Sequence, residues 1–341
     1  MRSSGANVVY SIVVPVYNEA ASLAELQRRL ADLLDRLDGS GEVVLVDDGS
    51  DDESYTRIAA AADADSRFKA VRLSRNFGHQ LAITAGLDFA SGDAVIVMDA
   101  DLQDPPEVAL ELAKRWRDGY DVVYAVREGR QGETRFKQLT ANAFYRLFRR
   151  LSDVDVPVDV GDFRLVSRNA LDVFRVMRES NRYVRGMFGW IGFRQTGVTY
   201  ERAERFAGIT KYPLRKMIGF AADGIVSFSN APLRAALQIG FVVSAVSFVF
   251  GLAALISRLG GLYSVSGLAS IAVMIGFLGG IQLLVLGMMG EYVARIHDEV
   301  KNRPLYVVRD LRGFDMESPV VGSSVIAPGT HSVVARVSEL R

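Results

Sequence analysis

Residues 95–106, with the sequence VIVMDADLQDPP, decide the fold of this chain. An apolar and largely β-branched run ends at Asp99 and Asp101, and the two prolines that follow prevent it from continuing. A short run of this kind, bounded by turn residues, is typical of a buried strand in a parallel sheet. Ligands of open α/β sheets bind beyond the carboxyl ends of the strands, so the acids are predicted to lie in a binding site.

Two acids of this stretch suit a divalent cation. Asp99 and Asp101 are separated by one residue at a strand end, so their carboxylates are predicted to point the same way. Carboxylate oxygens are the ligands that hard cations such as Mg²⁺ or Mn²⁺ prefer. For Asp104, which precedes two prolines, capping of the following helix is the alternative.

Strands and helices alternate along the first part of the chain. The apolar patterns predict strands at residues 10–17, 42–46, 70–73 and 94–98, separated by helices at 22–37, 55–64 and 78–90. This spacing predicts a parallel sheet covered by helices on both faces. A further strand is predicted at residues 121–126.

Composition limits the partners and the compartment. The chain has 341 residues and a formal net charge of zero, so no nucleic-acid partner is predicted. It contains no cysteine, which excludes disulfides and thiolate metal sites and is typical of a reducing compartment. Its three histidines are too scattered in sequence to indicate a zinc site. We expect no cleaved signal peptide, because the first residues run directly into a strand-like pattern.

Two long segments in the second half contain no charged residue. They cover residues 235–257 and 259–290, and each is long enough to cross a bilayer, which takes roughly 20 apolar residues. The short connector between them predicts a hairpin of two transmembrane helices, with a pair of buried core helices as the alternative. Cations flank the pair on its outer sides, so the N-terminal part and the tail are predicted to be cytoplasmic.

Acids at strand ends replace the usual phosphate-binding loops. The chain has neither a Gly-x-Gly-x-x-Gly after its first strand nor a Walker-type loop. Instead, acidic residues follow the predicted strands: Glu19, Asp47, Asp48, Asp99 and Asp101. Such a site would recognise base and ribose directly and contact phosphates through a metal, which fits a nucleoside-diphosphate donor.

Several stretches in order resemble the large family of inverting glycosyltransferases with the GT-A fold. They are SIVVPVYNEAASL (11–23), VVLVDDGSDD (43–52), LSRNFGHQLAITAGLDFASGD (73–93) and residues 95–106. Within that family, VGDFRLVSR (160–168), RAERFAGITKYPLRKM (202–217) and the two-span hairpin are similar to polyprenyl-phosphate hexosyltransferases. These include the bactoprenol-phosphate (undecaprenyl-phosphate) glucosyltransferases and, more distantly, the dolichol-phosphate mannose synthases. The resemblance implies a Rossmann-like GT-A sheet, a nucleotide-sugar donor and a polyprenyl-phosphate acceptor.

The resemblance also implies roles for individual residues. Those that would bind the donor are Pro15, Tyr17, Glu19, Asp47, Asp48 and Asp99. Asp99, Asp101 and Gln103 would hold Mg²⁺ or Mn²⁺ against the diphosphate, and Asp101 is also expected to be catalytic. Arg205 and Lys211 would close over the donor diphosphate or the acceptor phosphate.

Cations that follow residue 126 are candidates for the acceptor phosphate. Arg127 comes directly after a predicted strand and Lys137 follows in a Gly-containing segment, and we expect both to bind that phosphate. Residues 136–151 have a basic amphipathic pattern, which suits either an anionic membrane surface or an ordinary helix that faces a core.

Asp162 matches the position proposed for a general base in related bactoprenol enzymes and is expected to be catalytic. A phosphomonoester is already largely dianionic at pH 7, so Asp162 could instead orient the acceptor or shape the sugar pocket. A structural ion pair with Arg164 is the alternative. Residues 181–195 are aromatic, cationic and glycine-rich, and they either line the acceptor entrance or pack Trp190 and Phe193 into a core.

Together these patterns predict a cytoplasmic GT-A catalytic domain (1–200), amphipathic juxtamembrane helices (201–232), two transmembrane helices (233–290) and a partly disordered cytoplasmic segment (291–341). We expect a metal-dependent, inverting hexosyltransferase of the cell (inner) membrane that transfers glucose from UDP-glucose to polyprenyl phosphate. Alternative donors are GDP-mannose, UDP-N-acetylglucosamine and an amino-arabinose derivative. A non-catalytic partner in the translocation of lipid-linked sugars is the alternative of another class. The resemblance implies a homo-oligomer, with a tetramer as one form.

Overall fold

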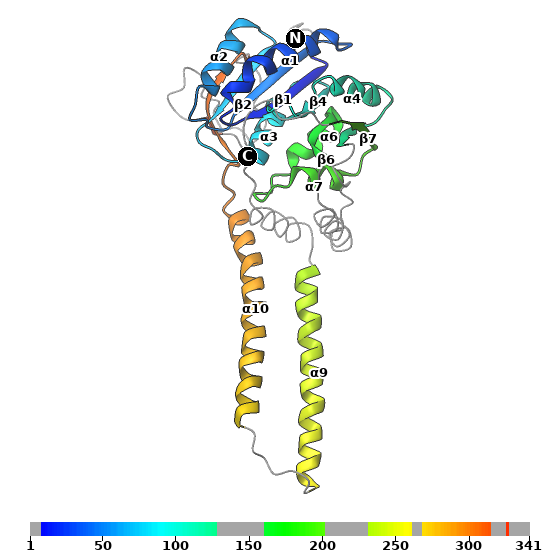
Figure 1. Ribbon diagram of the computed structural model, residues 1–341, viewed down its shortest axis with the longest axis vertical. Coiled ribbons are helices and arrows are strands. Elements are labelled where there is room, and N and C mark those ends of the chain that lie inside the picture. The colour runs from blue at the N-terminus through cyan, green and yellow to red at the C-terminus, as the bar shows by residue number, and fades with distance from the viewer. Residues whose placement is uncertain (1–7, 128–159, 202–230, 261–267, 315–324, 327–341) are drawn as a thin grey trace, which may run out of the picture. The chain divides into compact units, whose positions relative to one another are not determined.

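The computed structural model describes residues 8–127, 160–201, 231–260, 268–314 and 325–326 (Figure 1). The chain divides into two compact units. The first contains residues 1–145, 154–212 and 303–341, and the second contains residues 146–153 and 213–302. The first unit carries a β-sheet with its helices, and the second carries two long apolar helices.

Parallel strands form the centre of the sheet, as predicted. β1 (Tyr10–Val16) lies between β2 (Gly41–Asp47) and β4 (Ala94–Val97) and is parallel to both. β3 (Phe68–Leu73) continues the sheet parallel to β2. Among the described residues the strand order is β7-β5-β6-β4-β1-β2-β3-β8-β9. Because β1, β2 and β4 run the same way, the acids that follow them gather at one edge of the sheet.

One strand beside β4 departs from the parallel pattern. β6 (Val160–Ser167) is antiparallel to β4 and to β5 (Val122–Arg127), and β5 is in turn parallel to β7 (Gln195–Tyr200). In the register of β4 and β6, Val97 lies opposite Arg164. Asp162 precedes Arg164 by two residues, so the antiparallel strand brings a distant acid to the carboxyl end of β4, where His79 contacts both Asp162 and Asp99.

Helices follow the parallel strands and cover both faces of the sheet. They are α1 (Ala20–Arg36), α2 (Ser54–Ala64), α3 (His79–Phe89) and α4 (Val108–Arg117). Ile12 and Val14 of β1 belong to the same buried cluster as the leucine face of α1. Val13 points to the other face, where a Cβ at Gly86 of α3 would lie 2.2 Å from its Cγ1. Glycine therefore allows α3 to approach the sheet closely.

Two shorter helices flank the antiparallel part. α6 (Arg168–Val176) and α7 (Val184–Ile191) pack through Phe174 and Phe188, whose rings stack with centroids 4.6 Å apart. Trp190 at the end of α7 is 63% exposed and Phe193 is 37% exposed. Of the two alternatives for residues 181–195, packing of these two side chains into a core is therefore wrong, because Val184, Met187 and Phe188 fill the buried face of α7 instead.

The chain returns to the sheet after the second apolar helix. β8 (Val307–Arg312) is antiparallel to β3, and β9 (Val325–Ile326) is parallel to β8. The predicted C-terminal segment 291–341 did not include these strands. Tyr306, just before β8, is buried and its hydroxyl donates to Asp88 Oδ2 at 2.8 Å. The segment after α10 thus contacts the rest of the first unit twice: Tyr306 donates a hydrogen bond to α3, and β8 pairs with β3.

The second unit contains the two candidate membrane spans. They lie in α9 (Ala231–Leu259) and α10 (Leu268–Val300), over Ala236–Ala253 with a mean hydropathy of 2.0 and Met274–Val300 with a mean hydropathy of 1.5. Large apolar side chains along both helices are open to their surroundings, for example Phe241 at 76% and Leu283 at 71% exposure. By length and composition, both helices could cross a membrane.

Candidate active site

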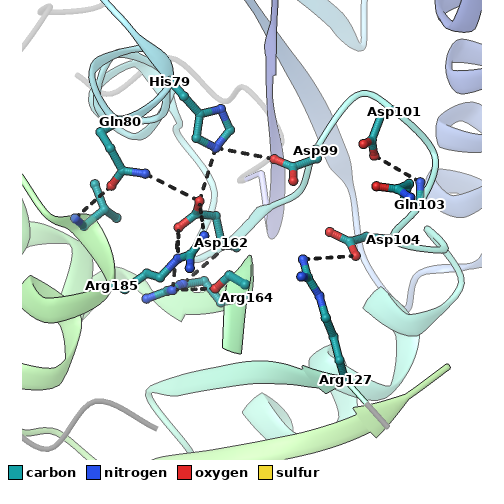
Figure 2. Close-up of polar contacts among 12 residues, drawn as sticks. His79, Gln80, Asp99, Asp101, Gln103, Asp104, Arg127, Asp162, Arg164 and Arg185 are labelled. Carbon is teal, nitrogen blue, oxygen red and sulfur yellow. Dashed lines mark hydrogen bonds and ion pairs between the residues drawn. The ribbon is translucent and has the colours of Figure 1, made fainter. Parts of the chain in front are cut away.

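Two carboxylates mark the edge of the sheet beyond β4 (Figure 2). The side chain of Asp99 is 27% exposed, and Asp101 is 8% exposed. The backbone N–H of Gln103 donates to Asp101 Oδ1 at 3.1 Å. Leu102 between them has a φ of 58°, a left-handed conformation that turns the chain sharply after the strand. The loop thus fixes the carboxylate of Asp101, whose charge acts on Asp99; that the two carboxylates point the same way stays a prediction.

The charge around Asp99 fits a cation. Burial, followed by the neighbouring carboxylates of Asp162, Asp104 and Asp101, raises the pKa of Asp99 to about 6, while His79 acts in the opposite direction. Burial is the largest cause of this shift and the neighbouring carboxylates add to it; a divalent ion at this place would favour the ionised form of Asp99. The described residues contain no cluster of at least three His, Cys, Asp or Glu side chains arranged around one ion. Asp99, Asp101 and the side-chain carbonyl of Gln103 are the residues that would hold such an ion, and oxygens of a donor phosphate would have to complete the ligand set.

Asp162 of β6 lies at the centre of a dense polar network (Figure 2). Nε and Nη2 of Arg185 donate to its Oδ1 and Oδ2 at 2.8 and 3.0 Å. Oδ2 also contacts Nε2 of His79 at 3.2 Å and accepts a hydrogen bond from Nε2 of Gln80 at 3.4 Å. Arg164 Nη2 also lies 4.0 Å from Oδ1, so the Asp162–Arg164 pair given as the alternative is present, but Arg185 is the closer partner. Arg164 is turned aside because its Nη2 donates to the carbonyl of Gly161.

The network fixes the charge of Asp162. Burial alone would raise its pKa, but the charges of Arg185 and Arg164 and the hydrogen bonds from His79 and Arg185 hold the pKa well below its usual range. His79 also lies 3.5 Å from Asp99 Oδ1 and so bridges two acids. Burial lowers the pKa of His79, yet the hydrogen bond to Asp162 and the charge of Asp99 outweigh burial and raise it above 6.5. The group is therefore a chain of paired charges that joins β4, β6, α3 and α7.

The loop after β1 is tied to the loop after β2. Asn18 has a φ of 55°, its N–H donates to Ser50 Oγ at 3.0 Å, and its side chain accepts from the N–H of Asp51 at 2.9 Å. Three predicted donor-binding residues lie around this turn: Pro15 is buried in β1, Tyr17 is 44% exposed and Glu19 is half-buried. The exposed ring of Tyr17 leaves a face for a stacking ligand.

Asp47 and Asp48 are more enclosed than the sequence suggests. Asp47 is fully buried, accepts from the N–H of Ser50 at 3.2 Å and lies 3.4 Å from Nε of Arg72. Asp48 is 2% exposed and accepts from the N–H groups of Phe77 and Gly78 at 2.7 and 2.9 Å. Burial is the main cause that raises the pKa of both carboxyl groups. Both shape the loops of the predicted nucleotide site, and their contact with a donor stays a prediction.

Arg127 lies on the other side of the acidic loop. Its Nη2 is 3.9 Å from Asp104 Oδ1, and its Nε is 3.3 Å from the hydroxyl of Tyr200. Asp104 is fully buried and accepts a hydrogen bond from that same hydroxyl. The capping alternative for Asp104 is wrong, because α4 begins at Val108 without a side-chain cap. Asp104 instead orients the hydroxyl of Tyr200 and the guanidinium of Arg127, and the side chain of Arg127 remains 31% exposed.

Part of the predicted acceptor site lies outside the described residues. Lys137, Arg205 and Lys211 belong to residues 128–159 and 202–230, and the basic helix at 136–151 belongs there as well. The prediction also missed His79, Gln80 and Arg185, which surround Asp162. His79 and Gln80 stand in the stretch 73–93 that carries the family resemblance, but no local pattern links them to a residue more than eighty positions later.

The chain is similar to known proteins over most of its length. Residues 11–174 match the family model described as glycosyl transferase family 2. The protein called uncharacterized glycosyltransferase YkcC of Bacillus subtilis is 47% identical over 91% of this chain and 96% of its own length. The bactoprenol glucosyl transferase of Shigella phage SfII is 41% identical over 88% of this chain and 97% of its own length. Among solved structures, mannosyl-3-phosphoglycerate synthase from Rubrobacter xylanophilus is 19% identical, covers 68% of this chain and 75% of its own, and has a TM-score of 0.46.

The chain belongs to glycosyl transferase family 2. It has the GT-A-like, mostly parallel sheet that the sequence predicts, and it is a glycosyltransferase. The family therefore does not favour the alternative of a non-catalytic partner in the translocation of lipid-linked sugars.

Proposed function

We propose that this glycosyltransferase moves a hexose, in the first place glucose from UDP-glucose, to a polyprenyl phosphate. The observation that carries the proposal is the acidic group around Asp99, which His79 links to Asp162, with Arg127 beside Asp104 of the same loop. Acids for a metal-bound diphosphate and a cation for a second phosphate are what such a transfer requires. The relative from Shigella phage SfII is named a bactoprenol glucosyl transferase, which supports the same acceptor class.

The donor would lie along the ends of β1, β2 and β4. Tyr17 would offer its exposed ring to the nucleotide base, and Asp47 and Asp48 would hold the loops around it. Asp99, Asp101 and Gln103 would hold Mg²⁺ or Mn²⁺. When bound, such an ion neutralises charge on the departing diphosphate.

The acceptor phosphate would approach from the side of Arg127. Its guanidinium would offset the repulsion between the lipid phosphate and the donor diphosphate, a role that Lys137, Arg205 and Lys211 are proposed to share. An oxygen of the lipid phosphate forms a bond to the anomeric carbon while the bond from that carbon to the diphosphate oxygen breaks, and UDP leaves with the electron pair. Attack opposite the leaving group inverts the anomeric centre. The attacking phosphate is already anionic at pH 7, so the step requires no proton acceptor.

The reaction is proposed to take place at the cytoplasmic face of the inner membrane. α9 and α10 would cross the bilayer as a hairpin, since their apolar side chains are open to their surroundings. Cations before the first span and after the second support a cytoplasmic catalytic domain. A homo-oligomer built through these helices stays a prediction.

A donor panel tests the proposal. The full chain, in membranes or detergent, is incubated with polyprenyl phosphate, Mn²⁺ or Mg²⁺, and labelled UDP-glucose, GDP-mannose, UDP-N-acetylglucosamine or an amino-arabinose donor. Mass spectrometry of the extracted lipid is expected to show a hexosyl polyprenyl phosphate, formed fastest from UDP-glucose. If no donor labelled the lipid fraction, the proposed acceptor would be wrong.

A further inference from the structure

Arg185 is held by Asp162 in a way that leaves one end of its guanidinium unused. Nε and Nη2 donate to the two carboxylate oxygens of Asp162 at 2.8 and 3.0 Å, a paired geometry that fixes the plane of the group. In the described part of the chain, no hydrogen bond or ion pair joins the remaining nitrogen, Nη1, to another residue. The side chain of Arg185 is 29% exposed, so a ligand can reach it.

The backbone of Arg185 is fixed as well as its side chain. The N–H of Val184, at the start of α7, donates to Oε1 of Gln80 at 3.0 Å. Nε2 of the same glutamine donates to Asp162 at 3.4 Å. One side chain on α3 therefore joins the start of α7 to the carboxylate that orients Arg185. Such support from a second layer of contacts is typical of groups that must meet a ligand in a defined geometry.

Asp162 itself is poorly placed to accept a proton. It is 4% exposed, and its Oδ2 is in contact with His79, Gln80 and Arg185 at the same time. A general base works best when its pKa lies near the working pH and when an oxygen can reach the proton. Here the carboxylate is enclosed and paired with a cation, which suits an orienting role better.

We propose that Arg185 binds a phosphate group during the reaction and that Asp162 is the positioning residue that holds it. The proposal rests on the proposed function, in which two phosphate-bearing substrates meet beside Asp99. The ligand is a phosphate oxygen, which either the lipid acceptor or the donor diphosphate can supply. Guanidinium groups suit this ligand because their N–H groups match the spacing of phosphate oxygens.

Steady-state kinetics on the full chain test the proposal. Arg185→Lys keeps a positive charge beside the buried Asp162 but loses the paired geometry, and Asp162→Asn keeps the side-chain shape but removes the charge. Arg185→Lys is expected to raise the KM of one substrate by about tenfold or more, with a smaller change in kcat. A raised KM for polyprenyl phosphate assigns the lipid phosphate, and a raised KM for UDP-glucose assigns the diphosphate.

The double variant distinguishes a positioning residue from a base. If Asp162 acts through Arg185, Asp162→Asn raises the same KM, and the double variant is no worse than the more affected single variant. A base would give the opposite result: Asp162→Asn would lower kcat at unchanged KM, and its effect would multiply with that of Arg185→Lys. That result, or unchanged KM values in Arg185→Lys, would overturn the proposal.

Two controls keep the test independent of folding and of the proposed function. Arg28→Gln removes an exposed arginine of α1, with a side chain 67% exposed, and is expected to leave both KM values unchanged. Thermal melting establishes that each variant is folded. If the wild type transfers no sugar, the proposed function fails by itself. Titrations with UDP and Mn²⁺ and with a short-chain polyprenyl phosphate then decide the inference, because Arg185→Lys must weaken the binding of one of them.

Discussion

Gly161 lies directly against the guanidinium of Arg127. A Cβ at position 161 would fall 2.8 Å from Nη2 and 3.4 Å from Cζ of that arginine. The two residues belong to neighbouring antiparallel strands, β5 and β6, so the absence of a side chain at one position makes room for the cation at the other. This contact gives Gly161 a role in the proposed acceptor site without any contact with substrate.

Gly161→Ala is therefore expected to raise the KM for polyprenyl phosphate, in the same direction as Arg127→Ala. The arginine side chain is flexible and can move aside, so we expect a change in melting temperature of no more than about 2 °C. Arg127→Ala is expected to raise the acceptor KM by about tenfold or more, and Gly161→Ala by less. An unchanged acceptor KM in Arg127→Ala would remove this residue from the phosphate site.

Asp101→Ala is expected to reduce transfer on the order of 100-fold or more, comparable to the loss of one group that stabilises developing charge. The measurement is the initial rate at increasing Mn²⁺, together with the stabilisation that UDP and Mn²⁺ confer on the melting temperature. In the variant, the rate should no longer rise with Mn²⁺, and UDP with Mn²⁺ should no longer raise the melting temperature. Asp32→Ala, which removes an acid of α1 with a side chain 59% exposed, is the matched control. Metal-dependent activity that persists in Asp101→Ala would refute the proposed metal site.

Glu42→Gln is expected to destabilise the chain at neutral pH. The side chain of Glu42 is 3% exposed, lies 2.5 Å from Nζ of Lys69, and accepts hydrogen bonds from the hydroxyl of Ser11 and the N–H of Ser91 at 2.6 and 2.7 Å. Burial raises its pKa, but Lys69 and the two serines outweigh burial and lower the pKa below 4.5. The variant should lose about 1–3 kcal/mol of stability at pH 7.

The pH dependence gives this prediction a sign. A depressed carboxyl pKa contributes stability above the unfolded pKa, and this contribution is lost as the pH falls through the folded pKa. Melting temperatures of wild type and Glu42→Gln in detergent should therefore differ at pH 7 and converge as the pH falls below 4.5. A difference that stays constant across this range would contradict a role for the ionised carboxylate.

Tyr306→Phe should weaken the attachment of the segment that follows α10. The variant loses the hydrogen bond to Asp88, which also pairs with Arg178 at 3.0 Å. Loss of one buried hydrogen bond to a charged group costs about 1.5–3 kcal/mol, which should lower the melting temperature by several degrees. Tyr120→Phe is the control, since no hydrogen bond of the Tyr120 hydroxyl is seen in the described part of the chain. Equal melting temperatures of the two variants would show that the hydroxyl of Tyr306 contributes nothing.

The parallel half of the fold could be predicted because its signals are local. The runs that became β1, β2 and β4 are short, apolar and followed by acids, and the leucines of α1 repeat at helical spacing. Strand ends in a parallel sheet meet at one edge, so the positions of Asp99 and Asp101 followed from the pattern. The bounds of these elements differ from the predicted ones by a few residues at most.

The rest depended on contacts between distant segments, which a single sequence does not record. The closest partner of Asp162 is Arg185 rather than the nearby Arg164, because α7 brings Arg185 alongside while Nη2 of Arg164 donates to the carbonyl of Gly161. β8 pairs with β3, which lies more than two hundred positions earlier. The sequence of β8 alone does not reveal that it pairs with β3. Burial of Asp47 and Asp48 likewise follows from the loops that close over them.

The pairing of β3 with β8 has a consequence for how the catalytic domain is attached. The chain leaves this domain before α9 and re-enters it after α10, so two separate connections link the domain to the apolar helices. A single proteolytic cut within residues 202–230 would break only one of them. The N-terminal fragment would still be retained by the cross-strand hydrogen bonds of β8 and by the contact between Tyr306 and Asp88, and it should co-purify with the helices until the chain is denatured.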